Sequence, residues 1–244
     1  MRYRATLAYD GTGFYGFQRQ RNAAPTVQGE VEAALGRISG QRVEVIGAGR
    51  TDAGVHASGQ VIAFDLNWRH TPEALRDALN AALPEAIAVR EVAEAAPDFH
   101  PRFDARSRTY VYRLYSASVR DPLRRLYAWH VSGDLDARAM QAAAECVLGT
   151  HDFTSFGTPP QGENPVRTVY EARWETGADG AYTFTITADA FLQHMVRSLV
   201  GTLVQVGQGR MTVEAFADIL AARQRGLVKG LAPPHGLTLV AVNY

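Results

Sequence analysis

Apolar and polar residues alternate along the first part of the chain and then change their period. Residues 2–10 carry apolar side chains at every second position, which predicts a strand with one buried face. Between Val27 and Ile38 the apolar positions follow helical spacing, with Thr26 as the expected N-cap and Gly40 just past the end. The sequence therefore predicts a strand followed by a capped helix.

The two periods recur along the rest of the chain. Further strands are predicted near residues 43–46, 59–66, 87–92, 110–115, 167–176, 181–188 and 237–242, and further helices at 71–83, 136–148, 191–204 and 213–223. The order strand, helix, strand occurs twice in the first hundred residues, which is typical of a ferredoxin-like α+β unit with an antiparallel sheet. The second half repeats this coarse plan. We therefore expect an α+β fold of two tandem ferredoxin-like (RNP-like) halves that form one extended antiparallel sheet, with helices on one face and a central cleft.

The boundary between the halves is expected where periodicity is weakest. Residues 97–108 contain Pro97 and Pro101 and show little regular pattern. We place an N-terminal α+β domain at residues 1–104 and a C-terminal α+β domain at residues 105–244.

Size and composition limit the class of protein. The chain has 244 residues, of which 46% are hydrophobic, so it can bury a substantial core. No run of 18 uncharged apolar residues occurs, so we expect a soluble, cytoplasmic protein without a membrane segment. Cys146 is the single cysteine, which excludes an internal disulfide and a multi-cysteine metal site.

The distribution of charge is more informative than its sum. The 25 basic and 25 acidic residues cancel, but Lys229 is the only lysine among the basic residues. Arginine pairs with phosphate through two hydrogen bonds and stacks on bases. The stretch from Arg102 to Arg125 is rich in arginine and tyrosine, which indicates a nucleic-acid partner, although a polar strand face and hairpin would give the same pattern. The candidate RNA-binding residues are Arg19, Arg21, Arg106, Arg108, Arg124 and Arg125.

A glycine-rich stretch, residues 47–60, holds the best candidate for catalysis. It places Asp52 and Arg50 between two apolar runs, and its glycines permit a tight turn and close approach of a ligand. Arg50 can keep the Asp52 carboxylate ionised or clamp an anionic substrate against it. The alternative is that Asp52 only forms a turn through its side-chain hydrogen bonds.

Three other motifs are weaker. The stretch from Gly11 to Gly16 matches G-x-G-x-x-G, but no helix opens at its last glycine, so it does not indicate dinucleotide binding. Its aromatic, glutamine and arginine residues suit base stacking or, alternatively, an ordinary surface loop. Asp52 and His56 lack a third ligand at useful spacing, so no metal site is expected. A two-carboxylate glycosidase that pairs Asp52 with Asp65 or Glu44 cannot be positioned from sequence.

The octapeptide Gly49–His56, GRTDAGVH, resembles the signature of the tRNA pseudouridine synthase A family. The resemblance extends along the chain through Tyr9-Asp10-Gly11 with Tyr15-Gly16-Phe17-Gln18, Asp98-Phe99-His100-Pro101-Arg102-Phe103, Tyr110-Val111-Tyr112, Asp152-Phe153-Thr154-Ser155-Phe156, Asn164-Pro165-Val166-Arg167, His194-Met195-Val196-Arg197 and Gly236-Leu237-Thr238-Leu239-Val240. Phe17 stands where many members of the family have tryptophan, which alters an expected stacking surface.

The resemblance implies an activity and roles for several residues. It implies isomerisation of uridine to pseudouridine at positions 38, 39 and 40 of the tRNA anticodon stem-loop, by a homodimer without cofactor or metal. Asp52 matches the family's nucleophile, Tyr110 its substrate-stacking tyrosine, Arg197 its active-site arginine and Arg50 the arginine of the signature loop.

These roles suit the residue types. The target uridine must leave the helical stack, and the Tyr110 ring can receive its base while Asp52 acts at the sugar as nucleophile or base. Arg197 can counter the Asp52 charge. Val196, with Leu237 or Leu239, provides candidate apolar walls that exclude water. A non-catalytic protein that binds structured RNA and a carboxylate-using nucleosidase remain alternatives.

Overall fold

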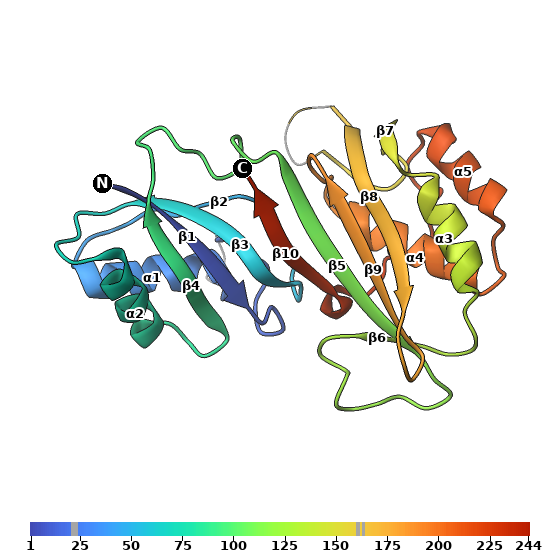
Figure 1. The fold of residues 1–244 in the computed structure, drawn as a ribbon, viewed down its shortest axis with the longest axis horizontal. Coiled ribbons are helices and arrows are strands. Elements are labelled where there is room, and N and C mark those ends of the chain that lie inside the picture. The colour runs from blue at the N-terminus through green and yellow to red at the C-terminus, as the bar shows by residue number, and fades with distance from the viewer. Residues whose placement is uncertain (21–23, 160–161, 163) are drawn as a thin grey trace. The chain divides into compact units, whose positions relative to one another are not determined.

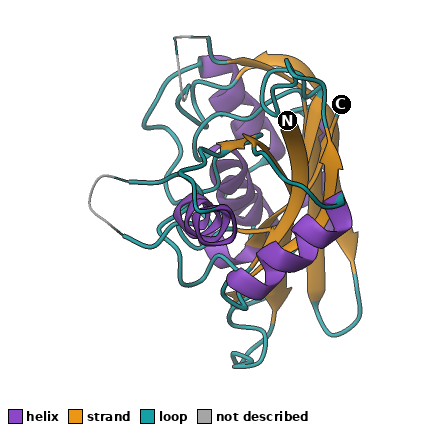
Figure 2. Cartoon of the chain, turned by 90° about the vertical axis from the view of Figure 1, so that its left-hand side faces the viewer, coloured by secondary structure: helices purple, strands orange, loops and turns teal. Residues whose placement is uncertain are grey.

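The computed structural model describes residues 1–20, 24–159, 162 and 164–244. In it the chain divides into two compact units (Figure 1). Unit 1 comprises Met1–Arg106 together with Thr238–Tyr244, and unit 2 comprises Ser107–Leu237. Each unit contains both helices and strands, as the colouring of Figure 2 shows.

The sheet of unit 1 is mainly antiparallel. Strand β1 (Arg2–Tyr9) lies between β4 (Ile87–Glu94) and β3 (His56–Asp65) and pairs antiparallel with both. The two-residue strand β2 (Ile46–Gly47) also pairs with β3. On its other side β3 pairs parallel with β10 (Leu237–Asn243). The last strand of the chain thus completes the sheet that the first strand begins.

Two helices cover this sheet, and each begins with a side-chain cap. Helix α1 (Val27–Ser39) starts after Thr26, whose hydroxyl accepts the Gly29 N–H, and ends at Gly40 in the left-handed conformation. Helix α2 (Pro72–Ala82) is capped in the same way by Thr71. Helix α2 packs on β4, and α1 packs on α2. Both predicted helices are confirmed, as is the predicted N-cap Thr26.

The sheet of unit 2 has the strand order β5-β9-β8-β7, with antiparallel pairing throughout. Its strands are β5 (Ser107–Ser116), β7 (Gly149–Asp152), β8 (Val166–Thr176) and β9 (Ala181–Ala188). A short strand, β6 (Trp129–Val131), pairs parallel with β5. The sequence had indicated three of these strands, but not β6 or β7.

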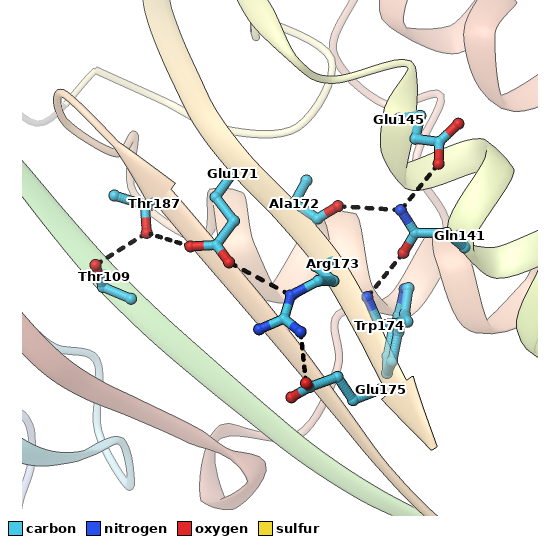
Figure 3. Close-up of polar contacts among 9 residues, drawn as sticks. All are labelled: Thr109, Gln141, Glu145, Glu171, Ala172, Arg173, Trp174, Glu175 and Thr187. Atoms are coloured by element: carbon cyan, nitrogen blue, oxygen red, sulfur yellow. Dashed lines mark hydrogen bonds and ion pairs between the residues drawn. The ribbon is translucent and has the colours of Figure 1, made fainter.

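Three helices pack in unit 2: α3 (Ala137–Glu145), α4 (Met195–Gly207) and α5 (Val213–Ala222). Helix α3 contacts β8, α4 and α5, and a 3-10 turn, η1 (Pro234–Gly236), contacts β5. Gln141 ties α3 to β8, because its Oε1 accepts the Trp174 N–H at 2.8 Å (Figure 3). The apolar side chains of α4 that recur at helical spacing, Met195, Val196, Leu199, Val200 and Leu203, are all buried.

The face of the unit 2 sheet that lies away from its helices is polar (Figure 3). The hydroxyl oxygens of Thr109 and Thr187 lie 2.9 Å apart, and Thr187 donates to the Glu171 carboxylate at 3.2 Å. Arg173 pairs with both Glu171 and Glu175. The sheet of unit 2 therefore buries one face and leaves the other partly polar, as strand alternation allows.

The α+β class and the antiparallel sheets are confirmed within each unit. Whether the two halves form one extended sheet with a central cleft stays a prediction. The domain boundary between residues 104 and 105 also stays a prediction. The compact units differ from the predicted domains in two respects. Unit 1 extends to Arg106, and residues 238–244 also belong to it, through the pairing of β10 with β3.

Two local expectations were wrong. Val43 and Val45 are buried but form no strand, because α1 side chains satisfy the main chain of Val45: Glu32 accepts its N–H and Gln28 donates to its carbonyl. Helix α4 begins at Met195 rather than at Phe191, since His194 has a φ of 67° that no helix continues. Among the described residues, no helix is long and apolar enough to cross a membrane.

Candidate active site

The loop that carries Asp52, residues 48–55, lies between β2 and β3 and is fixed to β3 at its start. The Ala48 N–H donates to the Val61 carbonyl at 2.8 Å. The Gln60 Nε2 donates to the Gly49 carbonyl at 2.9 Å from a fully buried side chain. We call residues 48–55 the Asp52 loop. The buried side-chain amide of Gln60 holds its first turn in place.

The residue before Asp52 is fixed by two further contacts. The Tyr9 hydroxyl and the Thr51 Oγ1 lie 2.8 Å apart, and both side chains are buried. The Phe17 N–H donates to the Thr51 carbonyl at 3.1 Å. Burial raises the pKa of Tyr9 to about 12, against smaller opposite effects of hydrogen bonds with Thr51 and Gln60. The phenol thus stays protonated at neutral pH and can serve as a permanent tether.

The end of the loop packs against residues 10–17 so closely that only glycine fits. A Cβ on Gly11 would lie 2.1 Å from the Val55 carbonyl oxygen. Gly16 has a φ of +91°, and a Cβ there would lie 2.8 Å from the Thr51 carbonyl oxygen. The G-x-G-x-x-G stretch of this chain therefore supports the Asp52 loop through close backbone packing.

His56, which follows the loop, completes this support. Its Nδ1 accepts the Gly11 N–H at 3.0 Å and lies 3.2 Å from the Asp10 carboxylate. The imidazole is buried, so it connects β3 to the 10–17 segment. Throughout the described part of the chain, no three His, Cys, Asp or Glu side chains are grouped to hold a metal ion.

One expectation about this segment was wrong. Phe17 had been assigned to a stacking surface, but its side chain is only 3% exposed. Its ring lies 6.5 Å from that of Tyr9, and a Cβ on Gly47 would touch it at 2.4 Å. Phe17 belongs to the core under the loop, which the aromatic composition of the segment did not reveal.

Asp52 itself is half-buried, and its carbonyl accepts the Val55 N–H at 3.1 Å. A main-chain hydrogen bond thus closes the turn, and the turn does not need the Asp52 carboxylate as the acceptor. Contacts of Thr51 and Val55 on either side thus fix the main chain at Asp52. Such preorganisation is what a reacting carboxylate requires.

Two arginines bring positive charge to the start of this loop. Arg50 is exposed, and Arg102 is half-buried. The pKa of Arg102 is lowered first by its burial and then by the neighbouring positive charge of Arg50. A bound anion near both guanidinium groups would offset their mutual repulsion. The sequence assigns a site role to Arg50, whereas Arg102 is named there only within a family motif and an arginine-rich stretch.

In unit 2, Tyr110 and Tyr112 lie on the same side of β5, because side chains two apart in a strand share a face. Tyr110 is 8% exposed, and its ring meets that of Phe191 edge-on at 5.1 Å. The Tyr112 hydroxyl donates to the Pro233 carbonyl at 2.9 Å. Burial raises the pKa of Tyr112, and the positive charge of Arg197 opposes this shift.

Arg197 occupies the first turn of α4 and is half-buried. Its Nε donates to the Ala232 carbonyl at 2.8 Å, and its own carbonyl accepts the Ala232 N–H at 3.1 Å. Gly201, one turn further along, allows this approach, because a Cβ there would lie 2.8 Å from the Gly230 carbonyl oxygen. Val196 and Leu237, the expected apolar walls, are both buried, as is Leu239.

The candidate RNA-binding arginines differ in their surroundings. Arg106 and Arg125 are exposed. Arg19 pairs with Glu32 at 3.0 Å, and Arg124 pairs with Asp121 at 3.3 Å while its guanidinium lies 5.4 Å from the Tyr115 ring centre. Arg108 fits the expectation least, because it is only 8% exposed and donates to the Asp189 carbonyl at 2.7 Å. Arg21 lies outside the described residues.

Several residues around the site were not singled out from sequence. From the sequence, Tyr9 is only a strand position and part of the family motif Tyr9-Asp10-Gly11, Gln60 only the end of the glycine-rich stretch and a strand position, and Phe191 only the start of a helix. A signal existed for Gln60, because it is a polar residue inside an otherwise apolar run that leads into a strand. Nothing in the local pattern distinguished Tyr9 from other buried strand residues.

In each unit, candidate catalytic and substrate-binding residues are thus held in place by contacts with the main chain of an α+β fold. The sequence matches the profile of a family described as tRNA pseudouridine synthase over residues 5–104 and 143–244. It is 46% identical over 242 residues to "tRNA pseudouridine synthase A" of Chloroflexus aurantiacus, covering 98% of this chain and 87% of that protein. Identity is also 46% with the Moorella thermoacetica protein of that name (98% of each chain), and 43% with that of Neisseria meningitidis serogroup B (100% and 92%).

This chain belongs to the tRNA pseudouridine synthase family. The resemblance seen in the Asp52 loop therefore extends to almost the whole chain. A solved structure titled "Crystal structure of the archaeal box H/ACA sRNP Nop10-Cbf5 complex" contains a chain with a TM-score of 0.39 and 15% identity, covering 83% of this chain and 44% of that one. That likeness is too low to support any inference.

Proposed function

We propose that this protein isomerises uridine to pseudouridine in tRNA, at positions 38, 39 and 40 of the anticodon stem-loop. The observation that carries the proposal is the Asp52 loop: a carboxylate flanked by fixed residues, in a chain that belongs to this family. A protein that only bound RNA would have no need to fix the main chain on both sides of one carboxylate.

Asp52 is the proposed nucleophile. The uridine leaves the helical stack, so that its glycosidic bond becomes accessible to the carboxylate. The Asp52 carboxylate bonds to C1′ as the C1′–N1 bond breaks and the uracil leaves with the electron pair on N1. The uracil turns in place, and C5 displaces the carboxylate to form the C1′–C5 bond; C5 then loses its proton and N1 gains one. The reaction is an isomerisation in which no electron is gained or lost, so we expect it to need neither cofactor nor metal.

Tyr110 and Arg197 are the proposed partners from unit 2. The Tyr110 ring would stack on the flipped uracil, for which the edge-on Phe191 ring gives it a fixed orientation. Arg197, held by the Ala232 carbonyl, would supply a positive charge to the site, and Val196 and Leu237 would exclude water. The proposal requires both units to contact the same nucleotide.

The surroundings of the reaction follow from the same proposal. We expect Arg50 to contact the substrate backbone, and Arg19, Arg21, Arg106, Arg124 and Arg125 to contact phosphates further away. Arg108 is retained in this set with the least support, given its burial. We further propose a cytoplasmic homodimer in which each tRNA contacts both subunits; analytical ultracentrifugation with and without tRNA tests the assembly.

The decisive experiment uses a tRNA transcript whose uridines carry tritium at C5. Isomerisation releases the tritium while the base stays in the RNA; a nucleosidase releases labelled uracil; a protein that only binds RNA releases neither. Transcripts with cytidine at position 38, 39 or 40 then identify the sites. Retention of all tritium in the transcript, with tight binding, contradicts the proposed function.

A further inference from the structure

Phe103 stands on the surface of unit 1 with 72% of its area exposed. It belongs to the segment 97–106, which follows β4 in the chain. A single exposed apolar residue is common in proteins and means little by itself. Phe103 differs because its ring is part of an ordered stack.

The stack involves three side chains of one motif. The His100 ring lies over the Phe103 ring with centroids 4.2 Å apart and an interplanar angle of 29°. The Arg102 guanidinium carbon lies 5.7 Å from the Phe103 centroid. A ring covered on both faces would not keep 72% of its area exposed, so one face of Phe103 is open to solvent. We call His100, Arg102 and Phe103 the aromatic platform.

Hydrogen bonds within the segment hold the platform in place. The His100 Nδ1 accepts the N–H groups of Arg102 and Phe103, each at 3.2 Å. The Asp104 carboxylate accepts the His100 N–H at 2.8 Å, and the Asp104 N–H donates to the His100 carbonyl at 3.1 Å. Because the rings are already ordered, a ligand that stacks on them loses little affinity to ordering the loop.

The segment is also anchored to the sheet of unit 1. The Tyr244 hydroxyl donates to the Pro101 carbonyl at 2.8 Å, and the Arg2 Nε donates to the Phe99 carbonyl at 2.7 Å. The rings of Phe99 and Tyr244 lie 5.1 Å apart. Residues from the two ends of the chain thus fix the base of the platform.

Arg102 relates the platform to the Asp52 loop. Its pKa is lowered first by burial and then by the positive charge of Arg50, so the two guanidinium groups repel each other. An open aromatic face next to two arginines matches the chemistry of one nucleotide: a base to stack and a phosphate to neutralise.

We propose that the aromatic platform binds a nucleotide adjacent to the target uridine, whose base stacks on the open face of Phe103 and whose phosphate contacts Arg102 and Arg50. The inference rests on the proposed function for the identity of the RNA. It adds a second base-binding site, in unit 1, to the one expected at Tyr110. Because every base has a π face, this site would hold the RNA without reading its sequence.

The test measures binding in an Asp52→Asn background, so that turnover does not interfere. With an unmodified tRNA transcript, Phe103→Ala should raise Kd about tenfold or more, because stacking on one base contributes roughly 1–3 kcal/mol, or about 5- to 150-fold. Phe103→Trp should keep Kd within about twofold. Tyr170→Ala, a control at a ring that is 57% exposed in unit 2, should have no effect. An unchanged Kd for Phe103→Ala, or an equal loss for Phe103→Trp, overturns the proposal.

A second measurement separates stacking from loop structure. Tryptophan fluorescence is quenched by a stacked base, so saturating tRNA should quench Phe103→Trp more strongly than the parent, which has three tryptophans, and Tyr170→Trp should show no additional quenching. Absence of extra quenching at position 103 overturns the proposal. Arg102→Ala should lower the slope of log K against log salt by about 1, and Phe103→Ala should leave it unchanged.

The outcome is distinguishable from failure of the proposed function. Tritium release by the wild-type protein reports on isomerisation alone. If the wild type releases tritium and Phe103→Ala binds tRNA normally, only the platform is refuted. If the wild type releases none but the platform variants alter Kd as expected, the isomerase assignment fails and the binding site stands.

Discussion

The two units fix their candidate catalytic side chains in different ways. Asp52 sits on a loop, and the loop is held by buried polar contacts from Tyr9 and Gln60 and by close packing of Gly11. Arg197 sits on a helix, where intrahelical hydrogen bonds define the main chain, and one carbonyl, that of Ala232, orients the guanidinium. A loop needs several tethers to reach the rigidity that a helix has by construction.

The comparison teaches where substitutions should be costly. Around Asp52 the tethers are buried and cooperative, so removing one leaves its partners without a substitute. Around Arg197 the packed segment 230–232 is a coil with exposed residues at 230 and 231, which can shift at lower cost. We therefore expect equivalent changes to affect the Asp52 side more strongly, and the following predictions test this from the largest effect to the smallest.

The largest effect should come from Asp52→Asn. The variant loses the ionised carboxylate but keeps its size, so it should fold, bind the tRNA transcript with a Kd close to that of the wild type, and lose activity by a factor on the order of 10⁴. Tritium release and Kd measured on the same preparation check this. Substantial remaining turnover would remove Asp52 from the chemistry.

Gly11→Ala should be the most damaging change among the supports. Its Cβ would lie 2.1 Å from a carbonyl oxygen that cannot move without shifting the Asp52 loop. We expect the free energy of unfolding to fall by about 2–3 kcal/mol and kcat to fall roughly 10²-fold. Gly13→Ala is the matched control, since a Cβ at Gly13 meets no atom within 4 Å and should change neither quantity.

Gly201→Ala is the corresponding test in unit 2. The alanine gains about 1 kcal/mol of helix propensity but places a Cβ 2.8 Å from the Gly230 carbonyl oxygen, so segment 230–232 must move away from Arg197. We expect a net loss of about 1 kcal/mol and a roughly tenfold lower kcat/KM. Gly36→Ala in α1, where the nearest atom is 3.5 Å away, should instead stabilise the protein. A larger effect for Gly201 than for Gly11 would reverse the comparison.

Tyr9→Phe tests a single tether and gives a pH signature. Removing the hydroxyl should lower the free energy of unfolding by about 1 kcal/mol at pH 7, because Thr51 loses its partner. Since the pKa of Tyr9 is raised from 10.0 to about 12 on folding, its contribution is complete below pH 10 and is lost as the pH rises toward 12.

Urea unfolding at pH 7, 10 and 11.5 checks this pH signature. Stability of the wild type should fall across the alkaline range more steeply than that of Tyr9→Phe. The contribution of Tyr112 to stability also falls as the pH rises, because burial raises its pKa too, but it falls equally in both proteins. Tyr170→Phe, at an exposed ring, should follow the wild type; equal alkaline slopes for wild type and Tyr9→Phe would contradict the tether.

The smallest effect should be electrostatic. Replacing Arg124 and Arg125 together with alanine should reduce the slope of log K against log salt for tRNA binding by up to about 2, with little change in kcat. Arg173→Ala is the matched control, because that guanidinium is held between two glutamates on the polar face of unit 2 (Figure 3). An unchanged slope for the double variant would place the RNA on another surface.

Periodicity predicted most elements because their stability is local. The helices beginning at Val27 and Pro72 appear with the expected caps, since a Thr hydroxyl and a terminal glycine act within one turn. The strand expected at Val43 and Val45 did not form. Two apolar residues at strand spacing can be buried without pairing in a sheet, and here α1 side chains bind the main chain of Val45 instead. The start of α4 was predicted too early. His194 has a positive φ that prevents a helix at this position, and the pattern of hydrophobic residues does not reveal it.

The site was predictable only where its residues are exceptional in the sequence. Asp52 and Arg50 stood out among glycines, and the resemblance supplied Tyr110 and Arg197. Tyr9 and Arg102 could not be assigned these roles from the sequence, because the roles depend on interactions between residues more than forty positions apart. Gln60 is closer in sequence to its partner Gly49, but its burial follows from the sheet and not from the loop.

The pairing of β10 with β3 also constrains how this protein can fold. The final strand joins unit 1 only after all of unit 2 has been synthesised, and its partner lies roughly 180 residues earlier in the chain. Bringing two such distant segments together costs conformational entropy, so the pairing is slow to form. During synthesis, unit 1 also lacks β10 until the end of the chain has been made. The nascent N-terminal half should therefore remain incomplete until the C-terminal residues emerge, whereas unit 2 is free to form first.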